Sequence, residues 1–292
     1  EGSKERYMDK IIIFESATDS LKTFARLMAE GFREIGCQVL LADMQDVDKA
    51  REAVYGFASP GKTAALFFNH AGMNLLTKQR DIIWNELDVD CYDYIVDHPM
   101  YYHAAIIFPI RRLTFLCVDE YHQKFIERFY GGRVGSFFLP LAGIRSRRPA
   151  IPLEERSMDV LFTGAYLVDD STEYHVQGLG DGLRQLWLDC YGLLCKDTSL
   201  TLEAGMERCL GQRGAALPEE DLRDMIRLFQ DMDGILRSRA RAEVIRTLAN
   251  AGVGDVLKVA KNGNFWGALK TTNGAPKLAQ FQPAGPISTT AQ

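Results

Sequence analysis

The chain has 292 residues, a formal net charge of −5, and 47% hydrophobic residues against 25% charged ones. A chain of this length buries roughly three quarters of its unfolded surface, so it suits one large domain or two smaller ones. The net negative charge argues against the basic surface patch that proteins binding nucleic-acid grooves usually have. No apolar run reaches the length of a membrane span, and nothing near residue 1 resembles a signal peptide. We therefore predict a globular protein with no membrane span and no nucleic-acid partner.

The cysteines carry information about the compartment. The chain has six, without a C-x-x-C pair: Cys37, Cys91, Cys117, Cys190, Cys195 and Cys209. Structural zinc sites usually show closely spaced cysteines, so none is expected. We expect all six thiols to be reduced and the protein to be cytoplasmic.

The first half of the sequence alternates strand and helix patterns. Strands are predicted at 10–15, 38–42, 63–69, 92–96, 113–118 and 136–139, and helices at 16–35, 46–55 and 120–130. The apolar run at 10–15 is typical of a central parallel strand that is covered on both faces. The β-α-β-α-β order implies a parallel sheet with right-handed crossovers, hence a Rossmann-type α/β domain.

The second half is predicted to be mostly helical. Residues 145–155 are rich in arginine and proline and predict a linker, with a domain boundary at 150. A strand is predicted after it at 159–163, then helices at 183–193, 200–210, 218–229 and 237–250, and a weak strand at 256–259. No periodicity follows Leu269, and residues 271–292 are predicted to be disordered. The predicted domains are thus 1–150, 151–270 and a tail at 271–292.

Five segments each end an apolar run in polar residues. They read FFNHAG (67–72), YIVDHP (94–99), FLCVDEYH (115–122), FFLPLAG (137–143) and MDVLFTGAY (158–166). Ligands of open α/β sheets bind at the carboxyl ends of the strands. Four of the five histidines also lie between residues 70 and 122. The sequence therefore predicts a crevice lined by Asn69, His70, Asp97, His98, Asp119 and His122.

Asp97 and His98 form the most specific of these patterns. Pro99 biases His98 toward an extended conformation, which projects the imidazole into the predicted crevice. A carboxylate beside an imidazole can orient it and raise its pKa, and this suits a general base. The alternative is that His98 only caps the strand through its backbone neighbours.

The other candidates have structural alternatives as well. Asp119 and His122 are three residues apart at the start of a helix and lie on one face, but Asp119 is expected to act as an N-cap. Asn69 fits a turn-forming role as well as a ligand contact. Gly164 follows a predicted strand, where it lets the backbone turn tightly or approach a ligand.

Several common ligand motifs are missing. The turn after the first strand reads SATDS instead of G-x-G-x-x-G, and no G-x-x-x-x-G-K-[ST] occurs, which argues against dinucleotide and P-loop sites. Three D-x-D triplets, at 46–48, 88–90 and 231–233, have the carboxylates to hold a divalent metal. Short acidic triplets are also common on solvated surfaces. We predict no metal site.

Five motifs occur in order: N-x-x-G at 69–72, DHP at 97–99, VDEYH at 118–122, LPLAG at 139–143 and R-x-x-D-V-L-F-T-G at 156–164. Over about residues 8–166 the chain resembles the amino-terminal half of bacterial CgeB-like (spore-maturation-protein-like) group 1 glycosyltransferases. The resemblance implies a GT-B architecture, in which two Rossmann-like domains face each other across a cleft. In that architecture the first domain usually holds the acceptor and the second holds the nucleotide-sugar donor, without a bound metal.

The resemblance also implies a reaction. A hexose passes from a nucleotide diphosphate sugar to an acceptor hydroxyl on a protein or glycan, with no other cofactor. His98 is implied as the base or acceptor contact, Asp97 as its orienter, and Asn69 and His122 as contacts for acceptor or sugar. After residues 241–253 such enzymes continue with a full donor domain, whereas this chain becomes low in complexity, so we expect an incomplete donor half.

Two other functions stay open from the sequence. One is a non-catalytic module that holds a sugar or peptide in the same crevice. The other is a nucleotide-sugar epimerase or hydrolase on the same scaffold. Titration with a nucleotide sugar separates the enzymes from the module, and product analysis without acceptor exposes an epimerase or hydrolase.

Overall fold

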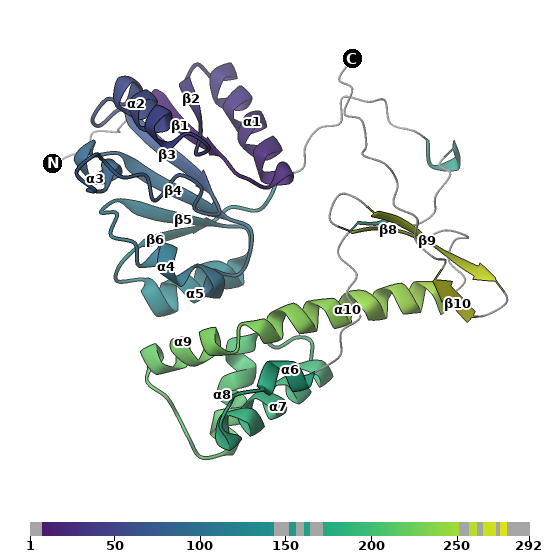
Figure 1. Cartoon of the computed structure of the whole chain (residues 1–292). Coiled ribbons are helices and arrows are strands. Elements are labelled where there is room, and N and C mark those ends of the chain that lie inside the picture. The colour runs from purple at the N-terminus through teal and green to yellow at the C-terminus, as the bar shows by residue number, and fades with distance from the viewer. Residues whose placement is uncertain are drawn as a thin grey trace. The chain divides into compact units, whose positions relative to one another are not determined.

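The computed structural model describes residues 8–142, 152–155, 161–163, 172–250, 257–261, 265–272 and 275–278. The chain divides into two compact units, Glu1–Gly143 and Ile144–Gln292, both drawn in Figure 1. The predicted boundary, at 150, lies a few residues beyond this division. Each unit contains a β-sheet of its own.

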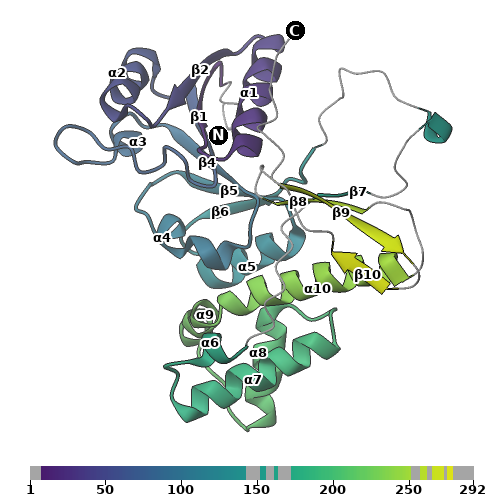
Figure 2. The same cartoon turned by 45° about the vertical axis from the view of Figure 1, so that its right-hand side comes forward.

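The first unit alternates strands with helices. Its elements are β1 (Lys10–Glu15), α1 (Asp19–Glu34), β2 (Gln38–Asp43), α2 (Val47–Phe57), β3 (Thr63–Phe68), α3 (Ile83–Glu86), β4 (Asp90–Ile95), the 3-10 helix η1 (Pro99–Tyr102), α4 (His103–Ile106), β5 (Leu113–Cys117), α5 (Glu120–Tyr130) and β6 (Gly135–Phe138). The six strands form one parallel sheet in the order β2-β1-β3-β4-β5-β6 (Figures 1 and 2). The predicted α/β class is confirmed, and the sheet is doubly wound and Rossmann-like.

The strand order contains one reversal. The chain leaves β1 for β2 on one side and then crosses back to β3 on the other side, so β1 pairs with both. At such a switch point the loops on either side diverge and leave room for a ligand at the carboxyl ends of the strands. The loops that follow β1 and β3 border this point.

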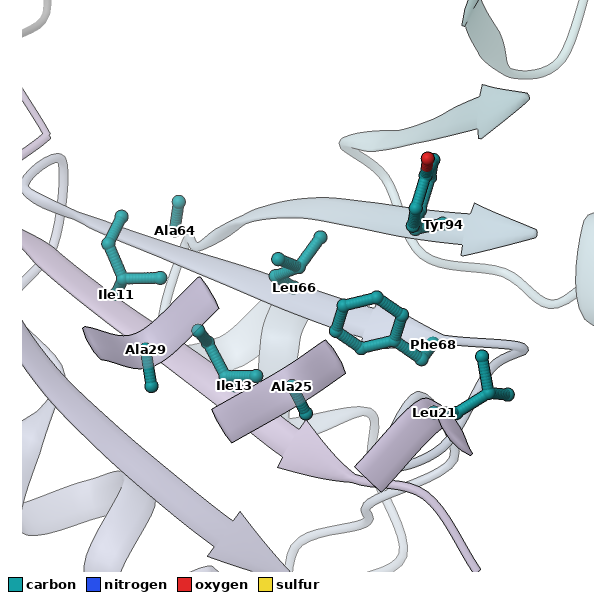
Figure 3. Packing of buried hydrophobic residues seen from close by; sticks show 9 residues of the cluster. All are labelled: Ile11, Ile13, Leu21, Ala25, Ala29, Ala64, Leu66, Phe68 and Tyr94. Atoms are coloured by element: carbon teal, nitrogen blue, oxygen red, sulfur yellow. The ribbon is translucent and has the colours of Figure 1, made fainter. Parts of the chain in front are cut away.

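Helix α1 covers one face of the sheet. Its buried residues Leu21, Ala25 and Ala29 recur every four positions and therefore lie on one side of the helix. They pack against Ile11 and Ile13, which share a face of β1 because alternate strand residues point the same way. Figure 3 shows this cluster, which also includes Ala64, Leu66, Phe68 and Tyr94.

The opposite face carries an aromatic cluster that anchors the loop after β3. The rings of Phe14, Phe67 and Trp84 lie 5.2 to 5.9 Å apart, centroid to centroid. The indole nitrogen of Trp84 donates to the carbonyl oxygen of Met73 at 3.0 Å. Gly72 has a φ of 88°, and a Cβ there would lie 2.2 Å from the ring of Phe14. The loop is thus held against the core next to the switch point.

The second unit combines helices with a smaller sheet. Its elements are the 3-10 helix η2 (Leu153–Glu155), β7 (Leu161–Thr163), α6 (Thr172–Val176), α7 (Asp181–Lys196), α8 (Leu202–Gln212), α9 (Glu219–Leu228), α10 (Asp231–Asn250), β8 (Leu257–Lys261), β9 (Phe265–Thr272) and β10 (Ala275–Leu278). The sheet order is β10-β9-β8-β7, in which β7 and β8 are parallel and the other pairs are antiparallel.

Strands β9 and β10 differ from the sequence prediction. The sequence predicts neither strand, and it predicts disorder at 271–292. Strand β9 runs into that segment and β10 lies within it. The rest of the predicted tail lies outside the described residues.

Candidate functional site at the carboxyl edge of the parallel sheet

Polar residues follow three adjacent strands of the first unit. Asn69 and His70 follow β3, Asp97 and His98 follow β4, and Asp119 follows β5. Because these strands are parallel neighbours, all five residues lie along one edge of the sheet, which we call the carboxyl edge. The structure divides them into one group around Asp97 and another around His98.

The Asp97 group joins the ends of β3 and β4. The side-chain amide nitrogen of Asn69 donates to Oδ2 of Asp97 at 3.2 Å, and the amide oxygen of Asn69 accepts from the backbone nitrogen of Val96 at 3.0 Å. The hydroxyl of Tyr102 donates to the same Asp97 oxygen at 2.9 Å. Burial and the adjacent Asp97 carboxylate raise the pKa of Tyr102. The phenol therefore stays protonated and fixed in place.

A left-handed turn directs His70 away from β3. Asn69 and His70 have φ values of 45° and 56°, a region that residues other than glycine seldom adopt, although asparagine and histidine enter it more readily than most. The backbone nitrogen of Asn69 donates to the carbonyl oxygen of Tyr94 at 3.1 Å. The backbone nitrogen of His70 donates to Oδ1 of Asp93 at 2.8 Å. Two hydrogen bonds to β4 thus hold a turn that is unfavourable by itself.

Asp93 is a buried carboxyl that the sequence analysis missed. Its side chain lies in the middle of β4 and the residue is 0% exposed. Its Oδ2 atom has no hydrogen-bond partner within the described residues. Burial raises the pKa of Asp93 to about 7, against the opposing effect of the hydrogen bond from His70. The sequence does contain a signal for Asp93, which is an acid inside the run CYDYIV. Parallel strands covered on both faces are usually apolar throughout, so an acid inside one is unusual.

Next to this turn lies a small cavity that we call the aromatic pocket. Its volume is about 260 Å³, and its lining residues are His70, Met73, Asn74, Tyr101, Tyr102, Ala104, Ala105 and Phe108. The rings of His70 and Tyr102 meet edge to face, with centroids 4.9 Å apart. Residues 100–103 are not among the site residues predicted from the sequence. Their position directly after β4 was the signal that could have placed them at the site.

His70 gives the aromatic pocket its reactive group. Desolvation lowers the pKa of His70, so the imidazole is neutral at pH 7. Within the described residues its ring nitrogens make no hydrogen bond, and the residue is exposed at the mouth of the pocket. In a neutral imidazole one nitrogen carries the proton and the other has a lone pair that can accept one. His70 is therefore able to accept a proton from a bound ligand.

The second group packs around His98. The ring of His98 lies 5.0 Å from that of His122 and 4.8 Å from that of Phe125, centroid to centroid. Its Nδ1 atom accepts from the backbone nitrogen of Met100 at 3.2 Å and begins η1. The proton of a neutral ring then lies on Nε2, and the Nδ1 lone pair is occupied. This is a capping geometry, and the base role of His98 stays a prediction.

The remaining predicted residues are placed as follows. Asp119 is the N-cap of α5, where its side chain accepts from the backbone nitrogen of Tyr121 at 2.7 Å. The carboxylate of Asp97 accepts from Asn69 and Tyr102, and its role in orienting His98 stays a prediction. Gly164 lies outside the described residues.

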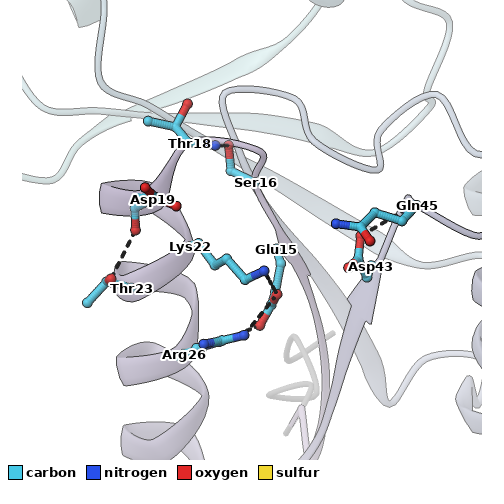
Figure 4. A network of polar contacts seen from close by, with 9 residues as sticks. All are labelled: Glu15, Ser16, Thr18, Asp19, Lys22, Thr23, Arg26, Asp43 and Gln45. Atoms are coloured by element: carbon cyan, nitrogen blue, oxygen red, sulfur yellow. Dashed lines mark hydrogen bonds and ion pairs between the residues drawn. The ribbon is translucent and has the colours of Figure 1, made fainter. Parts of the chain in front are cut away.

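The loop after β1, on the other side of the switch point, is closed by ion pairs. Glu15 lies between Lys22 and Arg26, with oxygen-to-nitrogen distances of 3.1 and 2.6 Å (Figure 4). Burial alone would raise the pKa of Glu15, but the two cations outweigh it and the pKa is lowered. Glu15 thus pairs with both Lys22 and Arg26, and its single negative charge offsets one of their two positive charges.

The three acidic triplets have protein partners. Asp46 caps α2, and Arg112 pairs with both Asp88 and Asp90. Asp231 bonds His175, and Asp233 bonds Arg237. Among the described residues, no group of three or more histidines, cysteines and acids is placed to hold a metal ion.

In the part of the chain that the structure describes, no helix has both the length and the apolar character needed to cross a membrane. All six cysteines are free thiols. No family model, no curated protein and no solved structure matches this chain.

Proposed function

We propose that this chain belongs to a cytoplasmic CgeB-like glycosyltransferase that transfers a sugar from a nucleotide diphosphate sugar to an acceptor hydroxyl. The proposal assigns the first unit to the acceptor side of a GT-B architecture and the second unit to the donor side. The ordered motifs support it, as does a cluster of polar residues at the edge where doubly wound sheets bind ligands. Six free thiols suit a reducing compartment.

The observation that carries the proposal is the imidazole of His70 beside the aromatic pocket. In sugar transfer the acceptor oxygen forms a bond to the anomeric carbon, and the bond from that carbon to the diphosphate breaks with its electron pair on the diphosphate. The acceptor hydroxyl must lose its proton as it attacks. His70 is neutral at pH 7 and exposed at the pocket mouth, so it is placed to take that proton.

The hydrogen bond between Tyr102 and Asp97 serves positioning. It holds the Tyr102 ring against His70, and Asn69 connects the same carboxylate to the end of β3. These contacts fix one wall of the pocket before a ligand arrives. A rigid wall lowers the entropy lost when acceptor and base come together.

The test is transfer from a nucleotide sugar to a sugar acceptor, followed by mass spectrometry of the products. We expect His70→Ala to lower the transfer rate by about 10²- to 10⁴-fold, the usual contribution of general base catalysis. Gln79→Ala is the matched control, because Gln79 is exposed on the same loop and does not line the aromatic pocket. An unchanged rate in His70→Ala would remove His70 from the mechanism.

A separate titration distinguishes the enzyme from a binding module. An enzyme binds the nucleotide sugar, whereas a module that binds only the acceptor gives no signal with the donor. Calorimetry of the full chain with each compound alone makes this measurement.

A further inference from the structure

The size of the aromatic pocket limits its ligand to one ring. At about 260 Å³ it falls below the roughly 300 to 1,000 Å³ of pockets that hold drug-sized molecules. Its lining includes Met73, which is 2% exposed, and the aromatic residues Tyr102 and Phe108. A six-membered ring with its substituents suits this volume.

The charge of the pocket limits its ligand further. No aspartate, glutamate, lysine or arginine is among the lining residues, and His70 is neutral at pH 7. The nearby carboxylate of Asp97 already accepts two hydrogen bonds, from Asn69 and Tyr102. Moving a charged group from water to a place without a partner is strongly unfavourable. The pocket therefore disfavours phosphates, carboxylates and ammonium groups.

Two polar side chains of the lining are exposed. They are His70 and Asn74, and within the described residues neither the His70 ring nitrogens nor the Asn74 amide makes a hydrogen bond. Together they offer donors and acceptors to a ligand. The other lining residues are aromatic or aliphatic: Met73, Tyr101, Tyr102, Ala104, Ala105 and Phe108. The matching ligand has apolar faces and a polar rim.

We propose that the aromatic pocket is a subsite for one uncharged hexopyranose, whose ring packs on Tyr102 and Phe108 while its hydroxyls bond His70 and Asn74. A pyranose has C–H groups on its faces and hydroxyls around its rim, which is the pattern of this pocket. The inference rests on the proposed function only in identifying this sugar as the acceptor. It makes the acceptor the uncharged sugar residue at the end of a glycan.

The test is an NMR titration of the full chain with methyl glycosides. The uncharged probes are methyl β-D-glucopyranoside and its galacto and manno isomers. The charged probes are methyl β-D-glucuronide and methyl β-D-glucosaminide. We expect at least one uncharged glycoside to shift the His70 ring resonances and to bind at least about tenfold more tightly than either charged analogue. Equal binding of charged and uncharged sugars, stronger binding of phenol, or no shift with any uncharged probe would overturn the proposal.

Variants locate the subsite. Asn74→Ala removes an exposed amide and should weaken glycoside binding about three- to tenfold, the effect of one hydrogen bond. Phe108→Ala should weaken it about tenfold through loss of the aromatic wall. Tyr121→Ala is the control, because Tyr121 is 60% exposed on α5 and does not line the pocket. An effect of Tyr121→Ala as large as that of Asn74→Ala would contradict the assignment.

The NMR titration and the transfer assay together separate this inference from the proposed function. Glycoside binding without transfer from any nucleotide sugar would leave the subsite in place and refute the transferase. Transfer to an acceptor without a shift of the His70 resonances by the glycosides would refute the subsite and leave the transferase in place.

Discussion

At the scale of single residues, Asp93 combines a thermodynamic disadvantage with a structural task. Its carboxyl is fully buried, and one oxygen has no hydrogen-bond partner within the described residues. Most buried polar groups in proteins are hydrogen-bonded. The other oxygen holds the backbone of His70 in its left-handed turn. Asp93 thus destabilises the fold while it fixes the residue at the pocket mouth.

Asp93→Asn should make the stability less dependent on pH. Because the pKa of Asp93 is about 7 in the folded state and roughly 3.9 in the unfolded state, the folded state binds the proton more tightly. The contribution of Asp93 to stability is therefore greatest below about pH 4 and falls by on the order of 4 kcal/mol as pH rises to about 7. Asparagine carries no charge and still offers an oxygen to the nitrogen of His70. Urea unfolding at pH 5 and pH 8 should show the variant gaining stability over the wild type, with the larger gain at pH 8, and an equal pH dependence in both proteins would contradict this.

Gly72→Ala should destabilise the first unit more than Gly61→Ala. Both glycines have positive φ angles, of 88° and 72°, so both substitutions strain the backbone by about 1 to 2 kcal/mol. Only at Gly72 does the added Cβ collide with a ring, that of Phe14. Overpacking of a core adds about 1 to 3 kcal/mol. Thermal unfolding compares the two variants, and equal losses would show that the contact with Phe14 is relieved without strain.

At the level of helices and strands, two aspartates act as helix caps, and substituting them tests whether Asp119 has a structural or a functional role. Asp119 caps α5 and Asp46 caps α2, each through a hydrogen bond to a backbone nitrogen. We expect Asp119→Ala and Asp46→Ala each to lower the free energy of unfolding by about 0.5 to 2 kcal/mol. If Asp119 is only a cap, neither variant changes glycoside binding at pH 7. A loss of binding in Asp119→Ala alone would return Asp119 to the site.

The sequence predicted the elements whose signal is local. The six strands of the parallel sheet are apolar runs, and the bounds predicted for α5 are those observed, 120–130. Strands β9 and β10 lie in a stretch rich in glycine, asparagine and threonine, and their structure depends on the pairing of β9 with β8 and of β10 with β9. Such pairing leaves no periodic signal in the strands themselves.

The site was predictable in its position and not in its detail. The strand-end pattern placed Asn69, His70 and Asp97 on one edge because neighbouring parallel strands end together. The division of the strand-end residues into a group around Asp97 and a group around His98 depends on which side-chain atoms bond, for example Tyr102 with Asp97. The strand-end pattern did not indicate Asp93, because this residue lies inside a strand.

At the scale of the whole molecule, the chain contains two units with separate sheets. Domains with their own cores usually unfold in separate transitions, so calorimetry should resolve two. Gly72→Ala should lower the midpoint of one transition and leave the other unchanged, because the added Cβ collides with Phe14 in the core of the first unit. A single transition that shifts as a whole would show that the units unfold together.

The position of β1 has a consequence for folding during synthesis. Strand β1 is made before β2 and β3, and it becomes an inner strand, bonded to β2 on one side and to β3 on the other. The apolar side chains of β1 therefore stay partly uncovered until Phe68, the last residue of β3, has left the ribosome. Only then are both neighbouring strands, β2 and β3, present. Chaperones that shield nascent apolar segments would therefore bind β1 while β3 is still inside the ribosome.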